Sequence, residues 1–416
     1  MKNIILIICG IIALSSCNNM PIDDIDPILP EPATACGEEN PESNIVINWC
    51  NPTPDRLGSG CLPLIYNNML IFNASIENPG ENQKVYFYDK GNGELLRTLD
   101  ILEEKRTIYH MGLWNDYLVI TYLAGGIDVI NLDNFEFLWQ YHNVPNEENR
   151  QKFIIVDDEL FMVISHGNKP YIDASSIVAF DMYTGTRRDI VKIHKEDLEG
   201  GAPHIHSVQL ETNNQGDDVY YFAISLIWPT GPDYQPSYST FWAYNETQGQ
   251  YQWQQGVVDT VLLQNDPAII FENSISVIGE NVYTFDKNTG ESINSTPQIG
   301  NQGHTAPLLV NDRIYAKSAQ ETLYCFDARD GSIIWENLET WGLSQNKLTH
   351  YKGKLYYSGF DNKLYVVDMA TGEILYEEKS PFKWGNFRLG GQVIDPATDL
   401  MYMLDELNVM SIELLE

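Results

Sequence analysis

Positive charge is scarce in this 416-residue chain. Only 25 Lys and Arg residues stand against 58 Asp and Glu residues, which gives a formal net charge of −33. Proteins that bind nucleic acid or anionic membrane surfaces gain affinity from clustered cations and from counterion release. The balance therefore argues against both kinds of partner. The excess of carboxylates is more simply explained as a coat that keeps the protein in solution.

Cysteine is also rare, and its few positions exclude several kinds of site. Cys9, Cys17, Cys36, Cys50, Cys61 and Cys325 are the only six, no two are adjacent, and none has the Cys/His spacing of a zinc site. Cys325 lies in an apolar strand pattern and is expected to be a buried free thiol. Cys50 and Cys61 are close enough for a local disulfide. Cys36 competes for either of them, so the pairing among these three stays open.

Long apolar runs are limited to the first residues, MKNIILIICGIIALSSC. The run from Ile4 to Leu14 is too short for a permanent membrane helix and is typical of a secretory signal, expected over residues 1–16. Its ending, Leu14-Ser15-Ser16-Cys17, resembles the lipobox of bacterial lipoproteins, in which the cysteine carries acyl chains. We therefore expect a lipid on Cys17, the alternative being an ordinary signal with an incidental cysteine. Asn18 follows instead of Asp, which favours the outer membrane; the periplasmic side and the cell surface both stay open.

The stretch from 17 to 44 has little that could form a core. It carries five prolines and seven acidic residues. Pro-rich sequence with charges of one sign tends to stay extended. We predict an acidic, lipidated tether over 17–44, followed by one domain over 45–416.

That domain repeats one short pattern. In CFDARDGSIIW (325–335) a strand ends at Asp327, Gly331 follows four residues later, and Trp335 comes four residues after that. Copies begin at Asp89, Asp181, Asp286 and Asp368, and Asn131 and Asn245 replace Asp in two more; the last three intervals are all 41 residues. Asp or Asn accepts hydrogen bonds within a tight turn, and Gly supplies a positive φ. The aromatics at Trp139, Trp253, Trp335 and Tyr376 are expected to pack against neighbouring repeats.

Short strands with Gly turns at this period predict propeller blades of four strands. The motifs LYCFDARDGSIIWE and LYVVDMATGEILYE resemble the PQQ-like repeat of quinoprotein-type propellers. Seven hairpins are complete, and the C-terminal stretch supplies three more strands, with Glu413 in the Asp place. IVINW (45–49), with Trp49 in the aromatic place, provides the missing outer strand. We predict an all-β fold: an eight-bladed β-propeller of four-stranded antiparallel blades, closed by an N-terminal outer strand, with seven blades as the fallback.

A long interval marks a candidate contact surface. Asp181 and Asn245 lie 64 residues apart, about 20 more than a blade needs, and the excess falls in KIHKEDLEGGAPHIHS and IWPTGPDYQPSYST. Propeller topology places both connections on one face and in one sector. Exposed aromatics bury a large area at little entropic cost, so Trp228, Tyr234 and Tyr238 are predicted to contact a partner.

Other polar and aromatic residues precede inner strands and are expected at the axial mouth of the same face: His204, His206, His304, His350, Lys383, Trp384 and Arg388. Each has a structural alternative, since a histidine can simply hydrogen-bond to a neighbouring loop and a lone Lys or Arg can be a solvated charge. His204 and His206 have His-x-His spacing but no third ligand. We therefore predict no metal site.

No catalytic set is recognisable. The quinoprotein dehydrogenases hold a quinone and a calcium ion over the propeller axis, and many have an adjacent cysteine pair beneath the quinone. This chain has no such pair, is much shorter, and is interpreted as lacking their tryptophan-rich docking repeats. A Ser-His-Asp set with local support, a phosphate-binding Gly loop and an EF-hand-like run are also missing from the sequence. We expect no enzymatic activity and no cofactor.

In size, lipid anchor and repeat type the chain resembles the BamB family, the propeller lipoproteins of the outer-membrane β-barrel assembly machinery. This resemblance implies a non-enzymatic scaffold or accessory subunit of an outer-membrane protein complex, whose partner is a β-barrel or an assembly protein. The alternative is a propeller that binds a small ligand, a glycan or a quinone, at its axial mouth. A PQQ-type dehydrogenase is the least favoured reading.

Overall fold

The computed structural model describes residues 36–54, 62–74, 83–101, 108–122, 125–142, 146–149, 152–167, 172–198, 201–228, 235–257, 268–279, 281–296, 306–318, 322–340, 347–359, 361–383, 385, 387, 391–405 and 407–415. For residues 74, 227, 228, 235–238 and 257 only the backbone is described. The predicted signal, Cys17 and tether residues 17–35 lie outside these ranges.

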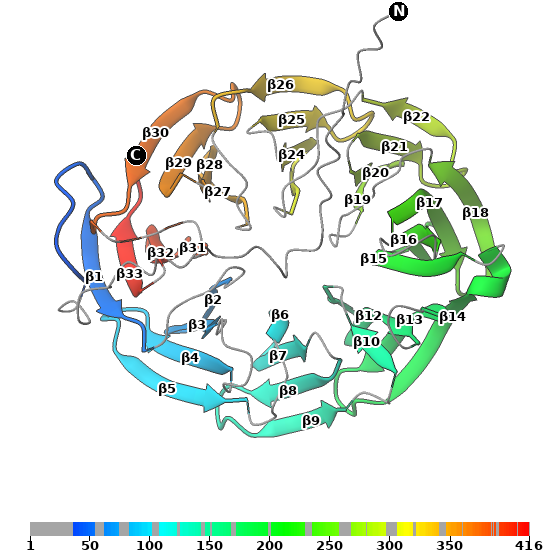
Figure 1. Ribbon diagram of the computed structural model, residues 1–416, viewed down its shortest axis with the longest axis horizontal. Coiled ribbons are helices and arrows are strands. Elements are labelled where there is room, and N and C mark those ends of the chain that lie inside the picture. Colours follow the sequence, from blue (N-terminus) through cyan, green and yellow to red (C-terminus); the bar gives the residue numbers. More distant parts are fainter. Residues whose placement is uncertain are drawn as a thin grey trace, which may run out of the picture.

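The strands form eight antiparallel sheets arranged as a ring, which confirms the predicted eight-bladed propeller (Figure 1). Blade 1 contains β2 (Leu64–Tyr66), β3 (Met69–Ala74), β4 (Lys84–Asp89) and β5 (Leu95–Asp100). Blade 2 contains β6 (Ile108–Trp114), β7 (Tyr117–Tyr122), β8 (Ile127–Asn131) and β9 (Phe137–Tyr141). Blade 3 contains β10 (Glu147–Asn149), β11 (Ile154–Val156), β12 (Glu159–His166), β13 (Ala174–Asp181) and β14 (Arg187–His194).

The 3-10 helix η1 (Lys195–Leu198) leads into blade 4, which contains β15 (Ala202–Thr212), β16 (Asp218–Trp228), β17 (Gln235–Asn245) and β18 (Gln250–Val257). Blade 5 contains β19 (Ile269–Phe271), β20 (Ser274–Ile278), β21 (Val282–Asp286) and β22 (Ser292–Ser295). Blade 6 contains β23 (Leu308–Val310), β24 (Arg313–Lys317), β25 (Leu323–Asp327) and β26 (Ile333–Asn337). Blade 7 contains β27 (Thr349–Tyr351), β28 (Lys354–Ser358), β29 (Lys363–Asp368) and β30 (Ile374–Lys379).

Blade 8 joins the two ends of the chain. It contains β31 (Gln392–Asp395), β32 (Leu400–Leu404) and β33 (Asn408–Glu413), and its outer strand is β1 (Ile47–Pro52). Trp49 pairs with Ser411 and Cys50 with Met410, so the blue and red strands lie side by side in Figure 1. The predicted closure by an N-terminal outer strand is confirmed, because β1 supplies the fourth strand of blade 8.

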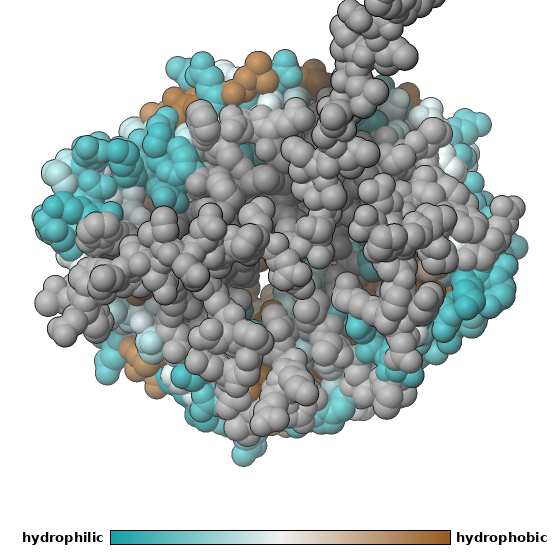
Figure 2. Space-filling view, viewed as in Figure 1, coloured by the Kyte–Doolittle hydropathy of each residue, from teal (hydrophilic) through white to brown (hydrophobic). Residues whose placement is uncertain are grey.

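The burial of each strand follows from its place in its blade. Middle strands are covered on both faces by neighbouring blades, and their sequences are accordingly continuous apolar runs such as LYCF in β25 and LYVV in β29. The core between blades 6 and 7 illustrates the pattern, with Tyr315 and Cys325 packed against Leu355 and Tyr365. Cys325 is a buried free thiol, as predicted. Outer strands are half exposed, and the rim is mostly hydrophilic with hydrophobic patches, one of them at β26 (Figure 2).

The recurrent turn forms as predicted. Asp286 Oδ1 accepts hydrogen bonds from the backbone N–H groups of Asn288 and Thr289, both at 2.9 Å, and the N–H of Gly290 donates to the Asp286 carbonyl. Gly290 has a φ of 73°, where a side chain would be strained. The carboxylate and the glycine therefore stabilise the same turn from its two ends.

Each tryptophan at the aromatic position packs onto the glycine turn of the next blade. The indole N–H groups of Trp49, Trp139, Trp253 and Trp335 donate to backbone carbonyls 34 to 43 residues further along the chain. A Cβ added to Gly290 would lie 2.6 Å from the Trp253 ring. These contacts confirm the expected packing between repeats. The sequence was interpreted as lacking tryptophan docking repeats. That interpretation is wrong, because tryptophan docking occurs at four of the blade junctions.

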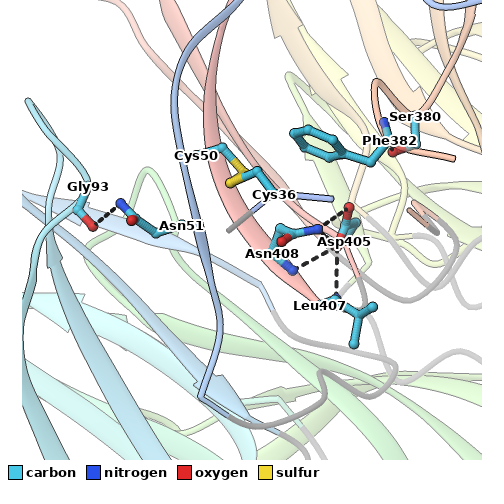
Figure 3. Close-up of a disulfide and its surroundings, with 9 residues drawn as sticks. All are labelled: Cys36, Cys50, Asn51, Gly93, Ser380, Phe382, Asp405, Leu407 and Asn408. Atoms are coloured by element: carbon cyan, nitrogen blue, oxygen red, sulfur yellow. Dashed lines mark hydrogen bonds between the residues drawn. A yellow bond between two sulfur atoms is a disulfide. The ribbon is translucent and has the colours of Figure 1, made fainter. Parts of the chain in front are cut away.

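The N-terminal segment 36–44 is folded against blades 7 and 8 (Figure 3). Glu39 forms an isolated β-bridge with Phe382, Asn40 Nδ2 donates to the Ser380 carbonyl (2.9 Å), and Asn44 Nδ2 donates to Glu378 (2.9 Å). Residues 36–44 are thus part of the folded body, and the boundary of the tether lies closer to the N-terminus than residue 44. Among the described residues, no helix is long and apolar enough to cross a membrane.

The disulfide joins Cys36 to Cys50, one of the pairings that the sequence left open, so Cys50 is not joined to Cys61. Both sulfurs lie beside the core between blades 7 and 8, because segment 36–44 returns along this junction before the chain enters β1. Cys61 lies outside the described residues. The bond closes a loop around the segment and fixes it to the last blade.

Candidate functional site

The propeller has two different faces. One face carries the connections that enter the inner strands and those that join the second and third strands, and we call it the loop face. The Asp-x-x-x-Gly turns lie on the opposite face, which we call the turn face. In blade 4, Ala202 at the start of β15 pairs with Ile227 near the end of β16, and Trp228 pairs with Gln235. This register places both predicted insertions at the loop face of the same blade, as expected.

Blade 4 is taller than its counterparts. From Asn245 to Gln235 strand β17 pairs with β16 at ten positions, whereas β25 pairs with β24 at five. Five further pairs raise the hairpin by about 17 Å at roughly 3.4 Å per residue. Most of the inserted sequence therefore lengthens strands, which corrects the expectation of irregular loops.

Blade 3 is raised as well, with eight pairs between β12 and β13. We call the loop-face ends of blades 3 and 4, residues 162–166, 174–178, 202–206, 224–228 and 235–240, the raised sector. Trp228 and Tyr238 lie in paired strands of this sector, but their side chains and all of Tyr234 lie outside what the structure describes. The predicted partner-binding aromatics are thus located by backbone alone.

His204 and His206 lie on β15 inside the raised sector, and neither is among the residues that line the axial cavity described below. His206 is 4% exposed, and its Nε2 is hydrogen-bonded to Ser225 Oγ (2.6 Å), which contacts Ser239 Oγ (2.8 Å). Burial, and secondarily the nearby His204, hold the pKa of His206 well below its usual value, so the imidazole is neutral. This chain of polar contacts crosses β15, β16 and β17. Within the described residues, no group of three His, Cys, Asp or Glu side chains could hold a metal ion.

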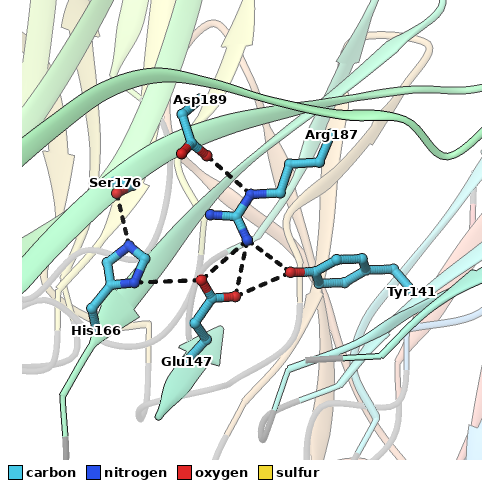
Figure 4. A network of polar contacts seen from close by, with 6 residues as sticks. All are labelled: Tyr141, Glu147, His166, Ser176, Arg187 and Asp189. Carbon is cyan, nitrogen blue, oxygen red and sulfur yellow. Dashed lines mark hydrogen bonds and ion pairs between the residues drawn. The ribbon is translucent and has the colours of Figure 1, made fainter. Parts of the chain in front are cut away.

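A second polar cluster in blade 3 was not foreseen (Figure 4). His166 Nε2 is 2.8 Å from Ser176 Oγ, and His166 Nδ1 is 3.4 Å from Glu147 Oε1. The order serine, histidine, carboxylate is that of a nucleophilic triad. Ser176 is fully buried, however, so its hydroxyl is not accessible to a substrate. No local motif signals this cluster, because the extra strand β10 brings Glu147 to His166.

The same glutamate binds an arginine. Arg187 Nη1 donates to Glu147 Oε2 (2.9 Å) and to the hydroxyl of Tyr141 in blade 2 (2.7 Å), and Arg187 Nε donates to Asp189 (3.0 Å) (Figure 4). The Glu147 and Arg187 side chains are 10% and 20% exposed. The contacts join β10, β14 and the neighbouring blade, so the cluster has a structural role at the junction of blades 2 and 3.

An axial cavity of about 910 Å³ lies inside the ring. It is lined by β2, β6, β23, β27 and β31 and by the residues before β11, that is, by six of the eight blades. Its polar lining consists of His110, Lys152, Lys347, Thr349, His350, Tyr351, Gln392 and Asp395. Apolar side chains such as Leu64, Met111 and Val393 form much of the remaining wall.

The predicted axial-mouth residues are only partly brought together. His350 lines the cavity and is exposed to it. Lys383 instead pairs with Glu38 of the N-terminal segment, so its assignment to the mouth is corrected. His304, Trp384 and Arg388 lie outside the described residues. The other seven polar lining residues were missed, although each lies in or just before an inner strand, as His350 does: His110, Lys152, Lys347, Thr349, Tyr351, Gln392 and Asp395.

The cavity lining carries positive charge within an acidic protein. Burial, and then the charges of Lys152 and Lys347, lower the pKa of His110 to about 3. Asp395, the one carboxylate among the described lining residues, pairs with Lys90 at 2.7 Å.

Comparison with known proteins agrees with the fold. A family model described as "Outer membrane protein assembly factor BamB" matches residues 239–395. BamB from Moraxella catarrhalis superposes with a TM-score of 0.55 at 12% identity, covering 89% of this chain and 100% of that one. The chain is a PQQ-like propeller that resembles BamB.

Enzymes and a designed protein share the fold. A europium-containing methanol dehydrogenase superposes with a TM-score of 0.63 at 13% identity, covering 89% of this chain and 87% of that one. The computationally designed protein Ika8 gives 0.62 at 12% identity, covering 89% and 100%. At such identities the likeness shows the fold alone. No curated protein sequence matches the chain significantly.

The calcium ion of quinoprotein dehydrogenases does not fit the described cavity lining. A calcium ion needs several oxygen ligands, mainly carboxylates. Asp395 is the one carboxylate in the described lining, and it is engaged by Lys90. Lys152 and Lys347 would also repel a cation. We therefore assign no step of chemistry to such a group.

Proposed function

We propose that this protein is a lipid-anchored scaffold or accessory subunit of an outer-membrane protein complex, and that it docks through the raised sector. The fold-level similarity to BamB supports an assembly role in the outer membrane. The proposed partner is a β-barrel or an assembly protein. The lipid on Cys17 would hold the propeller at the membrane.

The height of blade 4 is the observation that carries the proposal. Its hairpin stands about 17 Å higher than a five-pair hairpin, and it is stiffened along its length by pairing to β15 and β18. A rigid element that projects from a scaffold is suited to docking, because little conformational entropy is lost on binding. Trp228 and Tyr238, near its tip, are residue types that commonly anchor interfaces.

The tether limits where the partner can be. Cys17 and Cys36 are 19 residues apart, and an extended chain of that length spans at most about 65 Å. Beyond Cys36 the chain is held on blades 7 and 8 by the disulfide and by Asn40. The propeller would therefore bind a partner at or close to the membrane surface.

Affinity purification from solubilised outer membranes tests the proposal. In the test variant, an Asn-Gly turn replaces residues 227–236 and removes the tip of the hairpin. The control variant shortens the loop 213–217, at the turn-face end of the same blade. We expect a stoichiometric membrane protein to copurify with the wild type and the control, and to be lost from the test variant. Copurification that survives removal of the tip, with the fold intact by circular dichroism, would contradict docking by the raised sector.

The anchor is tested separately. A Cys17→Ala variant is expected to leave the membrane fraction, because the acyl chains have lost their attachment site. If the variant stays in the membrane fraction at wild-type levels, the lipid is not what holds the protein there.

A further inference from the structure

The outer edge of blade 4 is long and carries no charge. Strand β18 has the sequence QYQWQQGV, with no acidic, basic or proline residue over its 8 positions. It lies at the rim of the ring (Figure 1), and in the part of the chain that the structure describes no strand pairs with its outer side. Alternate residues of an antiparallel edge strand direct their N–H and C=O groups outward, so this edge offers free backbone donors and acceptors.

The other outer strands have features that normally prevent pairing between sheet edges, namely charges, proline or short length. A charge or a proline occurs in β1, β5, β14, β26 and β30, and β9 and β22 have only 5 and 4 residues. A long edge without these features leads to uncontrolled association unless it has a defined partner. Among the described outer strands, β18 is therefore the one best suited to bind another strand.

The edge is held in place by blade 5. A bulge at Gln252 interrupts the pairing with β17, and β18 is regular from Trp253 to Val257. The indole N–H of Trp253 donates to the carbonyl of Lys287 (2.9 Å). Gln252 Nε2 donates to the carbonyl of Asn288 (2.8 Å). Because the strand is already ordered, little conformational entropy is lost when its outer side pairs.

The regular stretch defines one self-complementary register. Two copies of β18 that are related by a two-fold axis pair antiparallel, and the register that uses all of Trp253–Val257 places Gln255 opposite its counterpart. Gln254 then lies opposite Gly256, where an added Cβ would have no atom within 4 Å. The glycine therefore leaves room for the close approach of a second chain. A glutamine amide both donates and accepts hydrogen bonds, so Gln255 can bond to the same residue of the other copy.

The charge distribution permits a second copy at this edge. The chain has a net charge of −33, so two copies repel each other wherever their carboxylates approach. Exposed charges are largely screened beyond roughly 8 Å at physiological ionic strength, so the local surface decides whether contact is possible. Strand β22, the outer strand of blade 5, is uncharged like β18. Two adjacent outer strands of the rim thus present no like charges to a second copy.

We propose that the protein forms a two-fold homodimer in which the β18 strands of two copies pair antiparallel, with Gln255 opposite Gln255. The two sheets of blade 4 become one continuous sheet. The contact is isologous and uses the β18 edge of both copies, so association stops at the dimer. The dimer does not depend on the proposed docking role, because β18 ends opposite Ser239 and the tip of the hairpin, residues 227–236, takes no part in the pairing.

Sedimentation equilibrium of the purified full-length protein tests the dimer, in a detergent whose density is matched by the solvent. We expect a reversible equilibrium between monomer and dimer in the micromolar range. The dimer should become tighter when NaCl is raised from about 50 mM to about 500 mM, because the net charges of the two copies are then screened. A protein that stays monomeric at hundreds of micromolar, or that forms a series of larger oligomers, would overturn the proposal.

Charge variants test the register. Gln255→Glu and Gln255→Lys each place like charges opposite each other, and each should weaken the dimer about tenfold. An equimolar mixture of the two variants should restore a mixed dimer of about wild-type affinity, because a glutamate then faces a lysine. Gln250→Glu is the matched control, since it makes the same change in the same strand on the other side of the bulge and should leave the dimer unchanged. A mixture that stays monomeric, or an equal loss in Gln250→Glu, would refute pairing in this register.

Cross-linking in intact cells provides a second readout. In a Gln255→Cys variant, a short bis-maleimide should join two copies covalently. Thr98→Cys is the control, because Thr98 is an exposed position of the outer strand β5 in blade 1 and should give no dimer. Equal cross-linking of the two variants would mean that the copies meet by random collision and not through β18.

Discussion

The indole N–H of Trp335 in blade 6 donates to the backbone carbonyl of Met369 in blade 7 at 3.2 Å. The same relationship joins Trp49 to blade 1, Trp139 to blade 3 and Trp253 to blade 5. Tryptophan docking thus occupies every second junction of the ring. At the junction of blades 1 and 2 the guanidinium of Arg97 instead lies over the Phe135 ring, 4.2 Å from its centroid.

Substitution of one docked glycine should destabilise the ring. Gly372 has a φ of 78°, and a Cβ there would lie 2.5 Å from the Trp335 ring. Gly372→Ala combines backbone strain with a clash in a packed junction, so we expect a loss of about 3 kcal/mol in the free energy of unfolding. Gly353 is the matched control, with a φ of 77° and no atom within 4 Å of the added Cβ.

Gly353→Ala should therefore lose only the strain, about 1 kcal/mol. Urea denaturation of both variants and the wild type measures the difference. Equal losses in the two variants would mean that contact with the indole adds nothing beyond the φ requirement.

Much of the fold could be predicted because each blade carries its own local signal. The Asp and the Gly of a turn lie four residues apart, so one short stretch, such as Asp286 to Gly290, predicts one hairpin. Closure by β1 was also predictable. The strand pattern IVINW belonged to no complete repeat, and the last repeat had only three of its four strands. The packing of Trp139, Trp253 and Trp335 on neighbouring repeats was predicted, but it was not identified as tryptophan docking because only alternate blades carry the residue.

The site was harder to predict because its residues are brought together by the ring and not by the repeat. His110 and Gln392 lie about 280 residues apart in the sequence, and only closure of the ring brings both to one cavity. Cys36 pairs with Cys50 because segment 36–44 runs beside β30, and nothing periodic predicts that path. The contact between Glu147 and His166 likewise needs β10, a strand outside the four-strand pattern.

Loss of the disulfide should lower stability. Cys36 and Cys50 close a loop with a sequence separation of 14, and cross-linking such a loop restricts the unfolded chain by about 3 kcal/mol. Cys36→Ser is expected to lose about 2–3 kcal/mol in guanidinium denaturation. Reducing agent should destabilise the wild type by a similar amount and leave Cys36→Ser unchanged. Peptide mapping under non-reducing conditions should recover a Cys36–Cys50 peptide; a Cys50–Cys61 peptide would refute the pairing.

Stability should fall as the pH drops below 7, in part because of His110. Burial lowers its folded-state pKa to about 3, whereas an unfolded histidine titrates near 6.5. Between these values the unfolded state binds the proton and the folded state does not, so acidification favours unfolding. From pH 7.0 to 5.5 this group should cost about 1 kcal/mol.

A His110→Gln variant should lose that part of the pH dependence, because glutamine does not titrate. The range from 7.0 to 5.5 is chosen because most carboxylates stay ionised there. Denaturation midpoints of both proteins at the two pH values give the comparison. If the variant and the wild type lose the same stability, His110 is not protonated differently in the folded and unfolded states.

The ion pair at the junction of blades 2 and 3 should contribute more than those on the surface. Glu147 and Arg187 are largely buried, and Arg187 also donates to Tyr141. Glu147→Gln removes the buried charge partner of Arg187 and leaves only the exposed Asp189, so we expect a loss of about 2 kcal/mol in the free energy of unfolding. A double-mutant cycle with Arg187→Met should give a coupling energy above about 1 kcal/mol.

The ion pair between Arg329 and Asp312 is the exposed control, since the two side chains are 48% and 45% exposed. Arg329→Met should produce no measurable change in stability, because water screens that pair. Similar losses at the two sites would show that burial does not strengthen the Glu147–Arg187 contact.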